Sequence, residues 1–403
     1  MKSEKECSII NKSWGRVPLY KGWFLLKEIY LDNSATTAVD DSVSELIFKY
    51  MRENYGNPSS LHRLGLAAET LLSKSRSDVA SALDCAPNEV YFVSSGTEAN
   101  NTAMFGCARL KRRRGDRIII SSYEHPSVDE CANRLAEDGF DVVRIDPEQD
   151  GKISVRKLLE ECNEKTVLVS VMLVNNEIGA VNDISALCRA VKSRCPNALF
   201  HCDAVQGFGK IPISCKRLGV DTLSVSGHKI HAPKGVGALF VKKGVRLPPL
   251  LCGGGQESGL RSSTEATSII AGFAFAAKSA SENIPQNLAH AYSLNRLLKS
   301  ELEKLPQVEI NSPDDALPYI VNISAGKVRS EIMLHYLESY GIFVSSGSAC
   351  SKGAVSRTLS AYGLSASRID SALRISFSKH NTEEDILTFV EKLSDGLSDI
   401  LTN

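Results

Sequence analysis

The stretch Thr222–Phe240, TLSVSGHKIHAPKGVGALF, decides how the fold is interpreted. Polar and apolar residues alternate at its start, which predicts a β-strand. The pattern breaks at Gly227 and leaves His228 and Lys229 at the end of the strand. Desolvation at the mouth of a sheet lowers the pKa of an amine and makes it a usable nucleophile, as a Schiff-base lysine requires. Taken alone, the stretch also fits an exposed turn lysine, because most lysines are exposed.

The composition indicates a large globular chain. It has 403 residues, of which 43% are hydrophobic, and by length we expect about two domains. Lys plus Arg and Asp plus Glu both number 47, so the formal net charge is zero and no direct nucleic-acid partner is expected. The sequence has no apolar run long enough for a transmembrane helix, so no membrane partner is expected either.

The cysteines and the N-terminal residues indicate the cellular compartment of the protein. The 11 cysteines include no CxxC pair, which argues against a zinc ribbon or a thioredoxin motif. An odd number of cysteines spread along the chain favours a reducing compartment, and we expect a cytoplasmic protein. Residues 1–28 have no convincing signal-peptide core and are assigned as an N-terminal extension of unknown role.

Strand and helix patterns alternate through the first two thirds of the chain. Strands are predicted at residues 89–94, 117–122, 141–145, 166–174 and 199–202. This alternation predicts an α/β fold with a mostly parallel sheet covered by helices, whose ligands bind at the carboxyl ends of the strands. We assign residues 40–285 to a large domain, and residues 29–39 with 286–403 to a smaller α+β domain. A long helical region is expected over about residues 265–305.

Polar residues follow two of the predicted strands. One set is suited to bind an anion, and the other is suited to bind a cation. Ser95-Gly96-Thr97 opens a helix after a strand and offers free N–H groups, as a phosphate-binding turn does. It lacks the Walker spacing, and an ordinary helix cap fits the residues as well. Asp203 ends a buried strand, where its carboxylate needs a cationic partner such as a protonated ring nitrogen. A structural Asp that caps a local turn is the alternative.

Histidine and arginine add further candidates. His125, at a strand-to-helix junction, suits stacking on a flat cofactor or proton relay, although a structural histidine is the more common case. His228 and His231 have no carboxylate or cysteine at ligand spacing, so no metal site is expected. Arg374 alternates with apolar strand residues and is placed to bind a substrate carboxylate, or to protect a sheet edge.

The segment Ser345–Gly353, SSGSACSKG, holds a cysteine among small polar residues. Cys350 is therefore expected to be accessible, and the nearby Lys352 would favour its thiolate. A loop cysteine without a role is the alternative.

From Ile29 to about Ile400, the chain resembles cysteine desulfurases of the NifS/IscS type. These are pyridoxal-phosphate (PLP) enzymes of fold type I in the class V aminotransferase family. The matching motifs, in order, are YLDNSATT, YGNPSSLHRLG, SSGTEANN, EHPSV, VNNEIGAV, HCDAVQ, SVSGHKIHAPKGVGAL, GGGQESGLRSST, SSGSAC and LRISFS. No single motif is specific to the family, and the evidence for the resemblance is that all ten occur in the family's order.

The resemblance implies a role for each matching residue. The catalytic residues would be the cofactor-linking Lys229, the nucleophile Cys350 and the ring-stacking His125. The residues that would contact the cofactor are Gly96, Thr97, Asn176, Asp203, Gln206, Ser226, His228, Lys229 and Thr264. The substrate contacts would be Asn33, Asn176 and Arg374. Within these sets, Asp203 would pair with the pyridinium nitrogen and Gln206 with the phenolic oxygen, and Thr264 would act across a homodimer interface.

The implied reaction converts L-cysteine to L-alanine and leaves the sulfur on an enzyme cysteine as a persulfide. A sulfur-acceptor protein would then receive it for iron–sulfur cluster assembly or tRNA thiolation. A selenocysteine lyase or an aminotransferase of the same fold is the alternative enzyme. A non-catalytic binding protein with the PLP fold is a further alternative, against which Lys229, Asp203, His125 and Cys350 together argue.

Overall fold

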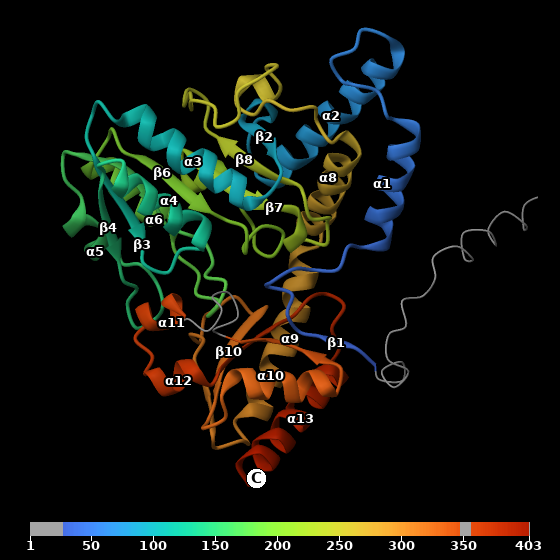
Figure 1. The fold of residues 1–403 in the computed structure, drawn as a ribbon, viewed down its shortest axis with the longest axis vertical. Helices are drawn as coiled ribbons and strands as arrows, with labels where there is room; N and C mark the ends of the chain where they lie inside the picture. Colours follow the sequence, from blue (N-terminus) through green and yellow to red (C-terminus); the bar gives the residue numbers. More distant parts are fainter. Residues whose placement is uncertain (1–26, 347–355, 403) are drawn as a thin grey trace, which may run out of the picture.

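The computed structural model describes residues 27–346 and 356–402, and its larger part is built on one sheet (Figure 1). The strand order is β2-β8-β7-β6-β5-β3-β4, in which β8 is antiparallel to its neighbours and the other pairs are parallel. The strands are β2 (Val90–Val93), β3 (Arg117–Ser121), β4 (Asp141–Ile145), β5 (Thr166–Ser170), β6 (Leu199–Asp203), β7 (Thr222–Ser226) and β8 (Gly237–Val241). The predicted α/β fold with a mostly parallel sheet is therefore confirmed.

Helices cover both faces of this sheet because successive strand residues point to opposite sides. In β3, Ile118 and Ile120 join one apolar cluster, while Ile119 joins another. The first face packs against α3 (Gly96–Lys111) and α4 (Pro126–Glu137). The opposite face packs against α2 (Arg63–Ala82), α5 (Val155–Glu161), α6 (Ile184–Arg194) and α8 (Thr267–Glu282). Helix α1 (Asp41–Glu53) lies outside, against α8.

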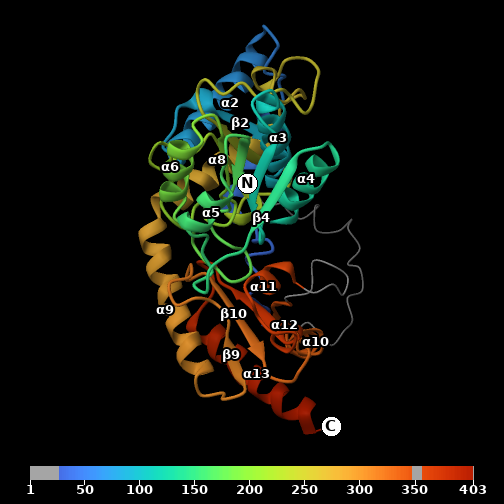
Figure 2. The same cartoon turned by 90° about the vertical axis from the view of Figure 1, so that its left-hand side faces the viewer.

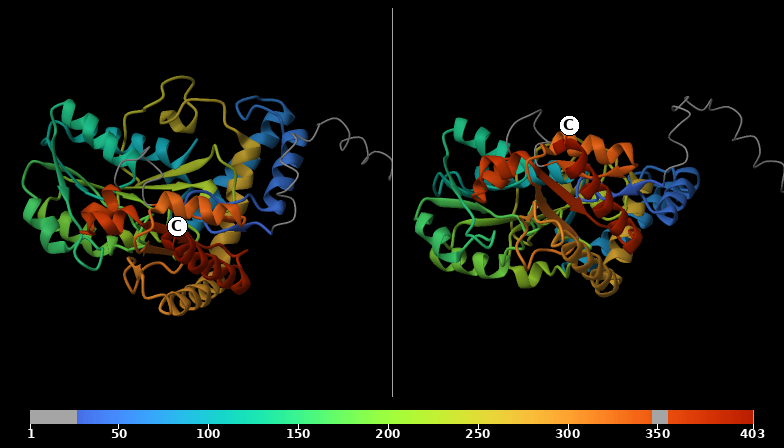
Figure 3. Two further views of the ribbon diagram at one scale, coloured as in Figure 1. Left: turned by 60° about the horizontal axis from the view of Figure 1, so that its bottom comes forward. Right: turned by 90° about the horizontal axis from the view of Figure 1, so that it is seen from below.

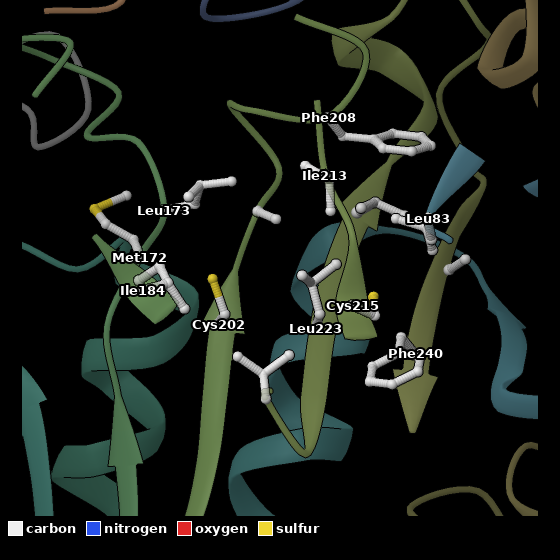
Figure 4. Close-up of a cluster of buried hydrophobic side chains, with 14 of the residues drawn as sticks. Leu83, Met172, Leu173, Ile184, Cys202, Phe208, Ile213, Cys215, Leu223 and Phe240 are labelled. Atoms are coloured by element: carbon white, nitrogen blue, oxygen red, sulfur yellow. The ribbon is translucent and has the colours of Figure 1, made fainter. Parts of the chain in front are cut away.

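The largest apolar cluster fixes the strand ends that carry polar residues. Figure 4 shows Cys202 of β6, Leu223 of β7 and Phe240 of β8 projecting from three adjacent strands into this cluster. All three side chains are at most 3% exposed. Their burial holds these strands in register, so the residues that follow β6 and β7 start from fixed positions.

The smaller part contains a four-stranded antiparallel sheet in the order β12-β13-β10-β9. Its strands are β9 (Val308–Ile310), β10 (Ile320–Ala325), β12 (Ser345–Ser346) and β13 (Ala372–Ser376). Beside it, β1 (Ile29–Tyr30) pairs in parallel with β11 (Ile342–Phe343). The accompanying helices are α10 (Ser330–Ser339), α11 (Arg357–Ala361), α12 (Ala366–Asp370) and α13 (Glu383–Thr402). The C-terminal elements among these lie together at one end of the molecule (Figure 1) and come toward the viewer when it is seen from below (Figure 3).

A separate apolar cluster supports the smaller part as a second unit. It joins Ile29 and Leu31 to α13 and β10 across most of the sequence. Helix α9 (Ile284–Leu302) is shared, since Ala291 packs in the large cluster while Leu294 and Leu298 pack in the small one. Figure 2 shows α9 running along the side of the molecule between the two parts. The predicted domain boundaries are consistent with this division and stay a prediction.

Two details differ from the sequence predictions. The predicted helical region over residues 265–305 is two helices, α8 and α9, which meet at Asn283. Pro285 stands at the start of α9, where its missing N–H and ring disfavour a continuous helix. Strand β5 ends at Ser170 rather than at Val174, and the N–H of Met172 donates to the Glu124 carboxylate at 2.7 Å. In the described part of the chain, no helix is long and apolar enough to cross a membrane.

Candidate active site

A cavity of about 520 Å³ lies where the ends of the large sheet's strands meet the smaller part. Ten of the predicted site residues line it, namely Gly96, Thr97, His125, Asn176, Asp203, Gln206, Ser226, His228, Lys229 and Arg374. Residues more than 270 positions apart in the sequence therefore face one space. The predicted nucleophile Cys350 falls outside the described residues.

Lys229 reaches the cavity through the single turn Gly227–Lys229 that follows β7. A side chain at position 227 would bring its Cβ within 2.9 Å of Val236 Cγ1 and 3.2 Å of the Pro233 carbonyl oxygen, so the turn needs glycine. The Lys229 ammonium donates to the carbonyl oxygens of Ser34 and Ala35, the latter over 2.8 Å. A loop from the N-terminal segment thus holds the amine at the cavity wall.

Asp203 ends β6 and is 4% exposed. Its Oδ2 accepts a hydrogen bond from Asn100 Nδ2 at 2.7 Å, and its Oδ1 accepts one from the Val205 N–H at 2.9 Å. Asn100 in turn lies 3.1 Å from His201 Nε2, and burial lowers the pKa of His201 to about 4. Because these partners are neutral near pH 7, they orient the carboxylate and leave its charge to attract a cation in the cavity.

His125 caps the start of α4 and stands at the cavity wall. Its Nδ1 accepts a hydrogen bond from the Ser127 N–H at 3.1 Å, which favours the neutral tautomer with the proton on Nε2. Burial lowers the pKa of this imidazole, while the Asp203 charge opposes the shift and Lys229 adds to it. Near pH 7, His125 therefore offers Nε2–H as a donor to the cavity.

The N-terminus of α3 forms a cradle for an anion. Ser95 caps the helix by accepting from the Glu98 N–H at 3.1 Å. A Cβ on Gly96 would lie 2.8 Å from Val205 Cγ2 and 3.4 Å from Ser226 Cβ, so glycine keeps this space open. Among the described residues, the buried Ser226 Oγ has no hydrogen-bond partner. Free helix N–H groups beside an unpartnered hydroxyl fit a phosphate group.

Arg374 lies on β13 of the smaller part and lines the cavity. It is 7% exposed, donates to Asp32 Oδ1 at 2.8 Å and to the Asn176 carbonyl at 3.0 Å. Its Nε has no hydrogen-bond partner among the described residues. Strand β13 lies between β12 and β10, so the alternative of a charge that protects a sheet edge does not apply.

The structure adds two buried carboxyl groups that sequence reasoning missed. Glu124 accepts from Ser121 Oγ at 2.6 Å and from the Met172 N–H at 2.7 Å through the same oxygen, and its other oxygen has no partner among the described residues. Burial raises the pKa of Glu124 to about 8. Glu177 accepts from Ser356 Oγ at 2.6 Å, and burial raises its pKa too. Both lie inside quoted motifs, EHPSV and VNNEIGAV, which was the available signal.

Two predicted residues do not line the cavity. Asn33 is buried, and its amide nitrogen donates to the Ser376 carbonyl at 2.9 Å. Thr264 lines a separate cavity of about 200 Å³ together with Arg261 and Glu257. The substrate role of Asn33 and the role of Thr264 toward a second subunit stay predictions.

Sequence spacing gave no carboxylate partner for His231, but the fold supplies one. Potential ligand atoms of Asp40, His231 and His380 lie within 4.8 Å of one another. The ammonium of Lys379 donates to Asp40 Oδ2, and His231 Nδ1 faces the Ala38 carbonyl at 2.9 Å. A positive charge is therefore already in place beside this carboxylate.

The fold and the cavity are those of a PLP-dependent enzyme. A family profile described as aminotransferase class-V matches residues 29–389. Cysteine desulfurase IscS of Clostridium botulinum is 38% identical over 373 residues, which cover 91% of this chain and 94% of that protein.

Solved structures agree with these sequence matches. A NifS-like protein superposes with a TM-score of 0.88 at 37% identity, covering 92% of this chain and 100% of that one. SspA in complex with cysteine superposes with a TM-score of 0.77 at 29% identity, covering 88% of this chain and 100% of that one. The chain belongs to the class-V aminotransferase family, among its cysteine desulfurases of the IscS and NifS type. The resemblance seen in the sequence is confirmed.

Proposed function

We propose that this protein is a PLP-dependent cysteine desulfurase that converts L-cysteine to L-alanine and takes the sulfur onto Cys350 as a persulfide. The observation that carries the proposal is the shared cavity. It places the amine of Lys229, the carboxylate of Asp203 and the guanidinium of Arg374 around one space of about 520 Å³.

The residues present fit the cofactor. The N–H groups that open α3, the unpartnered Ser226 hydroxyl and His228 would hold the phosphate. Asp203 would keep the ring nitrogen protonated, and Gln206 would donate to the phenolic oxygen. Lys229 would bind the aldehyde carbon covalently, with loss of water. When bound, PLP supplies an electron sink that stabilises negative charge at the substrate α-carbon.

The remaining groups would position the amino acid. Arg374 would bind the substrate carboxylate through its fork of N–H donors, held by Asp32 and the Asn176 carbonyl. His125 would hold its proton at Nε2, facing the cavity. The Cys350 thiolate would attack the substrate sulfur, forming an S–S bond as the C–S bond breaks, and the carbon that receives the electron pair would take up a proton to give alanine.

The partners and location are proposed on the same basis. The cysteine-bound SspA structure supports L-cysteine as the substrate. Thr264 supports a homodimer in which this residue serves the partner's cavity, and a sulfur-acceptor protein for iron–sulfur clusters or tRNA thiolation would take the persulfide. The nine cysteines that the structure describes are all free thiols, which supports a cytoplasmic location.

The test uses the full chain loaded with PLP. We expect a visible absorption band, a borohydride-reduced adduct that peptide mapping places on Lys229, and equal amounts of alanine and sulfide from L-cysteine with a thiol reductant present. Lys229→Ala should lose the adduct while the other lysines stay unlabelled. A preparation that aminates a keto acid, or that turns over selenocysteine but not cysteine, would favour the alternative enzymes. A wild-type chain that forms no adduct would favour a binding protein.

A further inference from the structure

Lys210 is a buried lysine for which the proposed reaction has no role. It lies in the turn after β6 and is 7% exposed. Its ammonium donates to Gln206 Oε1 at 3.1 Å. Burying an ammonium in this way is costly, and an apolar side chain of similar size would be tolerated at least as well by the fold. The position of Lys210 therefore calls for a role other than stability.

Lys210 and the Ser34 carbonyl together fix which end of the Gln206 amide faces the active-site cavity. A lysine ammonium has donors only, so the amide oxygen must face Lys210. The amide nitrogen then faces the other way and donates to the Ser34 carbonyl at 2.9 Å. The same carbonyl accepts from Lys229. Lys210, Gln206, Ser34 and Lys229 thus form one hydrogen-bonded chain along the cavity wall.

A second cavity also has Lys229 in its lining. It has a volume of about 280 Å³ and is lined by both Lys210 and Lys229. The other titratable groups that line it are Asp40, His231, Lys379 and Tyr319, whose ring centre lies 5.9 Å from the Lys210 ammonium. Burial, together with the charges of Lys229 and Arg374, lowers the pKa of Lys210 to about 7. This cavity also leaves room for the larger side chain of arginine at position 210.

We propose that Lys210 is a positioning residue for the phenolic oxygen of PLP: it holds the Gln206 amide with its nitrogen toward the cavity, where that oxygen would bind. The inference rests on the proposed function. Without Lys210, only the Ser34 carbonyl opposes a turn of the amide oxygen toward the cofactor, which would then lose a donor and meet an acceptor. Lys210 would act through Gln206 and need not touch the cofactor or the substrate.

The test measures the pH at which the visible band of the PLP-loaded protein changes. We expect Lys210→Met to raise this midpoint by about one pH unit, because loss of a donor and of a nearby positive charge both favour the protonated form. We expect kcat to fall about tenfold with KM for L-cysteine changed less than twofold, since one charge-assisted hydrogen bond is at stake. Lys210→Arg should return the midpoint most of the way to its wild-type pH. Lys216→Met, at an exposed lysine that pairs with Asp84, is the matched control and should behave as wild type.

Gln206→Leu tests whether Lys210 acts through the amide. If it does, Lys210→Met shifts the midpoint less in the Gln206→Leu protein than in wild type, because only the loss of the Lys210 charge still acts there. Independent, additive shifts would overturn the proposal, and so would a Lys210→Met protein with the wild-type midpoint and kcat. If Lys210→Met does not fold, Lys210→Gln replaces it in the same double-variant comparison. Because glutamine can still donate a hydrogen bond, we expect Lys210→Gln to shift the midpoint less. A wild-type chain without the band or without alanine release would instead refute the proposed function.

Discussion

Asn100 Nδ2 donates to Asp203 Oδ2 over 2.7 Å and joins two secondary-structure elements at the candidate active site. Asn100 lies on α3, whose first residues form the anion cradle, and Asp203 ends β6. One helix therefore fixes both the proposed phosphate end and the proposed ring-nitrogen end of the cofactor. The distance between the two ends is set by the rigid packing of α3 on the sheet.

Asn100→Ala should weaken PLP binding about tenfold, because the buried Asp203 carboxylate loses a hydrogen bond and can turn away. Titration of the apoprotein with PLP, followed by absorbance, measures the dissociation constant. Asn133→Ala, on the outer side of α4, is the control and should bind as wild type. Unchanged affinity in Asn100→Ala would show that Asp203 is held by Val205 and its surroundings alone.

Arg374→Lys should lower kcat/KM for L-cysteine by about a hundredfold. Lysine keeps the charge but cannot bind Asp32, Asn176 and a carboxylate in the geometry of a planar fork. Steady-state alanine formation measures the effect, and the visible band should stay. Arg329→Lys, at an exposed arginine paired with Asp370, serves as the comparison. If the two variants had the same kcat/KM for L-cysteine, Arg374 would have no role in substrate binding.

Cys350→Ala should abolish sulfide release while the PLP band remains, since the thiol is needed for sulfur transfer and not for cofactor binding. Cys252 is an exposed thiol in the described part of the chain, so Cys252→Ala is a matched control with full activity expected. Mass spectrometry after one turnover should find an added sulfur atom on Cys350. Full turnover by Cys350→Ala would contradict the persulfide step.

Glu124→Gln should flatten the dependence of stability on pH. In the folded protein burial raises the pKa of Glu124 from 4.5 to about 8, so between these values the folded state holds a proton that the unfolded state has released. Stability from this group is present below about pH 4.5 and is lost as pH rises toward 8. Wild type should lose up to about 1.4 kcal/mol per pH unit in this window relative to Glu124→Gln.

Urea unfolding at several pH values measures this difference. Glu53→Gln, at the exposed end of α1, is the control, and its stability should follow that of wild type at every pH. Parallel curves for wild type and Glu124→Gln would mean that Glu124 is ionised in the folded state near neutral pH.

Much of this site could be predicted from the sequence because it sits at strand ends. Asp203 follows β6 and Lys229 follows β7, and parallel strands bring their carboxyl ends to one edge. The alternation of apolar residues was enough to find those strands. The sharp break at Gly227 placed Lys229 correctly without knowledge of the side chains around it.

The supporting contacts could not be predicted in the same way. Asn100 contacts Asp203, and Glu124 contacts the Met172 N–H, across long sequence separations, and the motifs that contain them do not show these contacts. The proximity of Asp40, His231 and His380 likewise depends on packing of distant segments. The break at Pro285 was a local signal, and the long apolar pattern on either side obscured it.

The ion pair between Asp32 and Arg374 has a consequence for the order in which the protein becomes competent during synthesis. The two residues are 342 positions apart, and Asp32 emerges from the ribosome long before its partner. The last strand of the large sheet ends at residue 241, so the cavity residues from Gly96 to Lys229 that are proposed to hold the cofactor are all made well before Arg374. The proposed carboxylate anchor, Arg374, pairs with Asp32 only after the C-terminal sheet has packed against the N-terminal loop. In the proposed function, a chain that has not yet reached Arg374 would therefore lack its anchor for free cysteine.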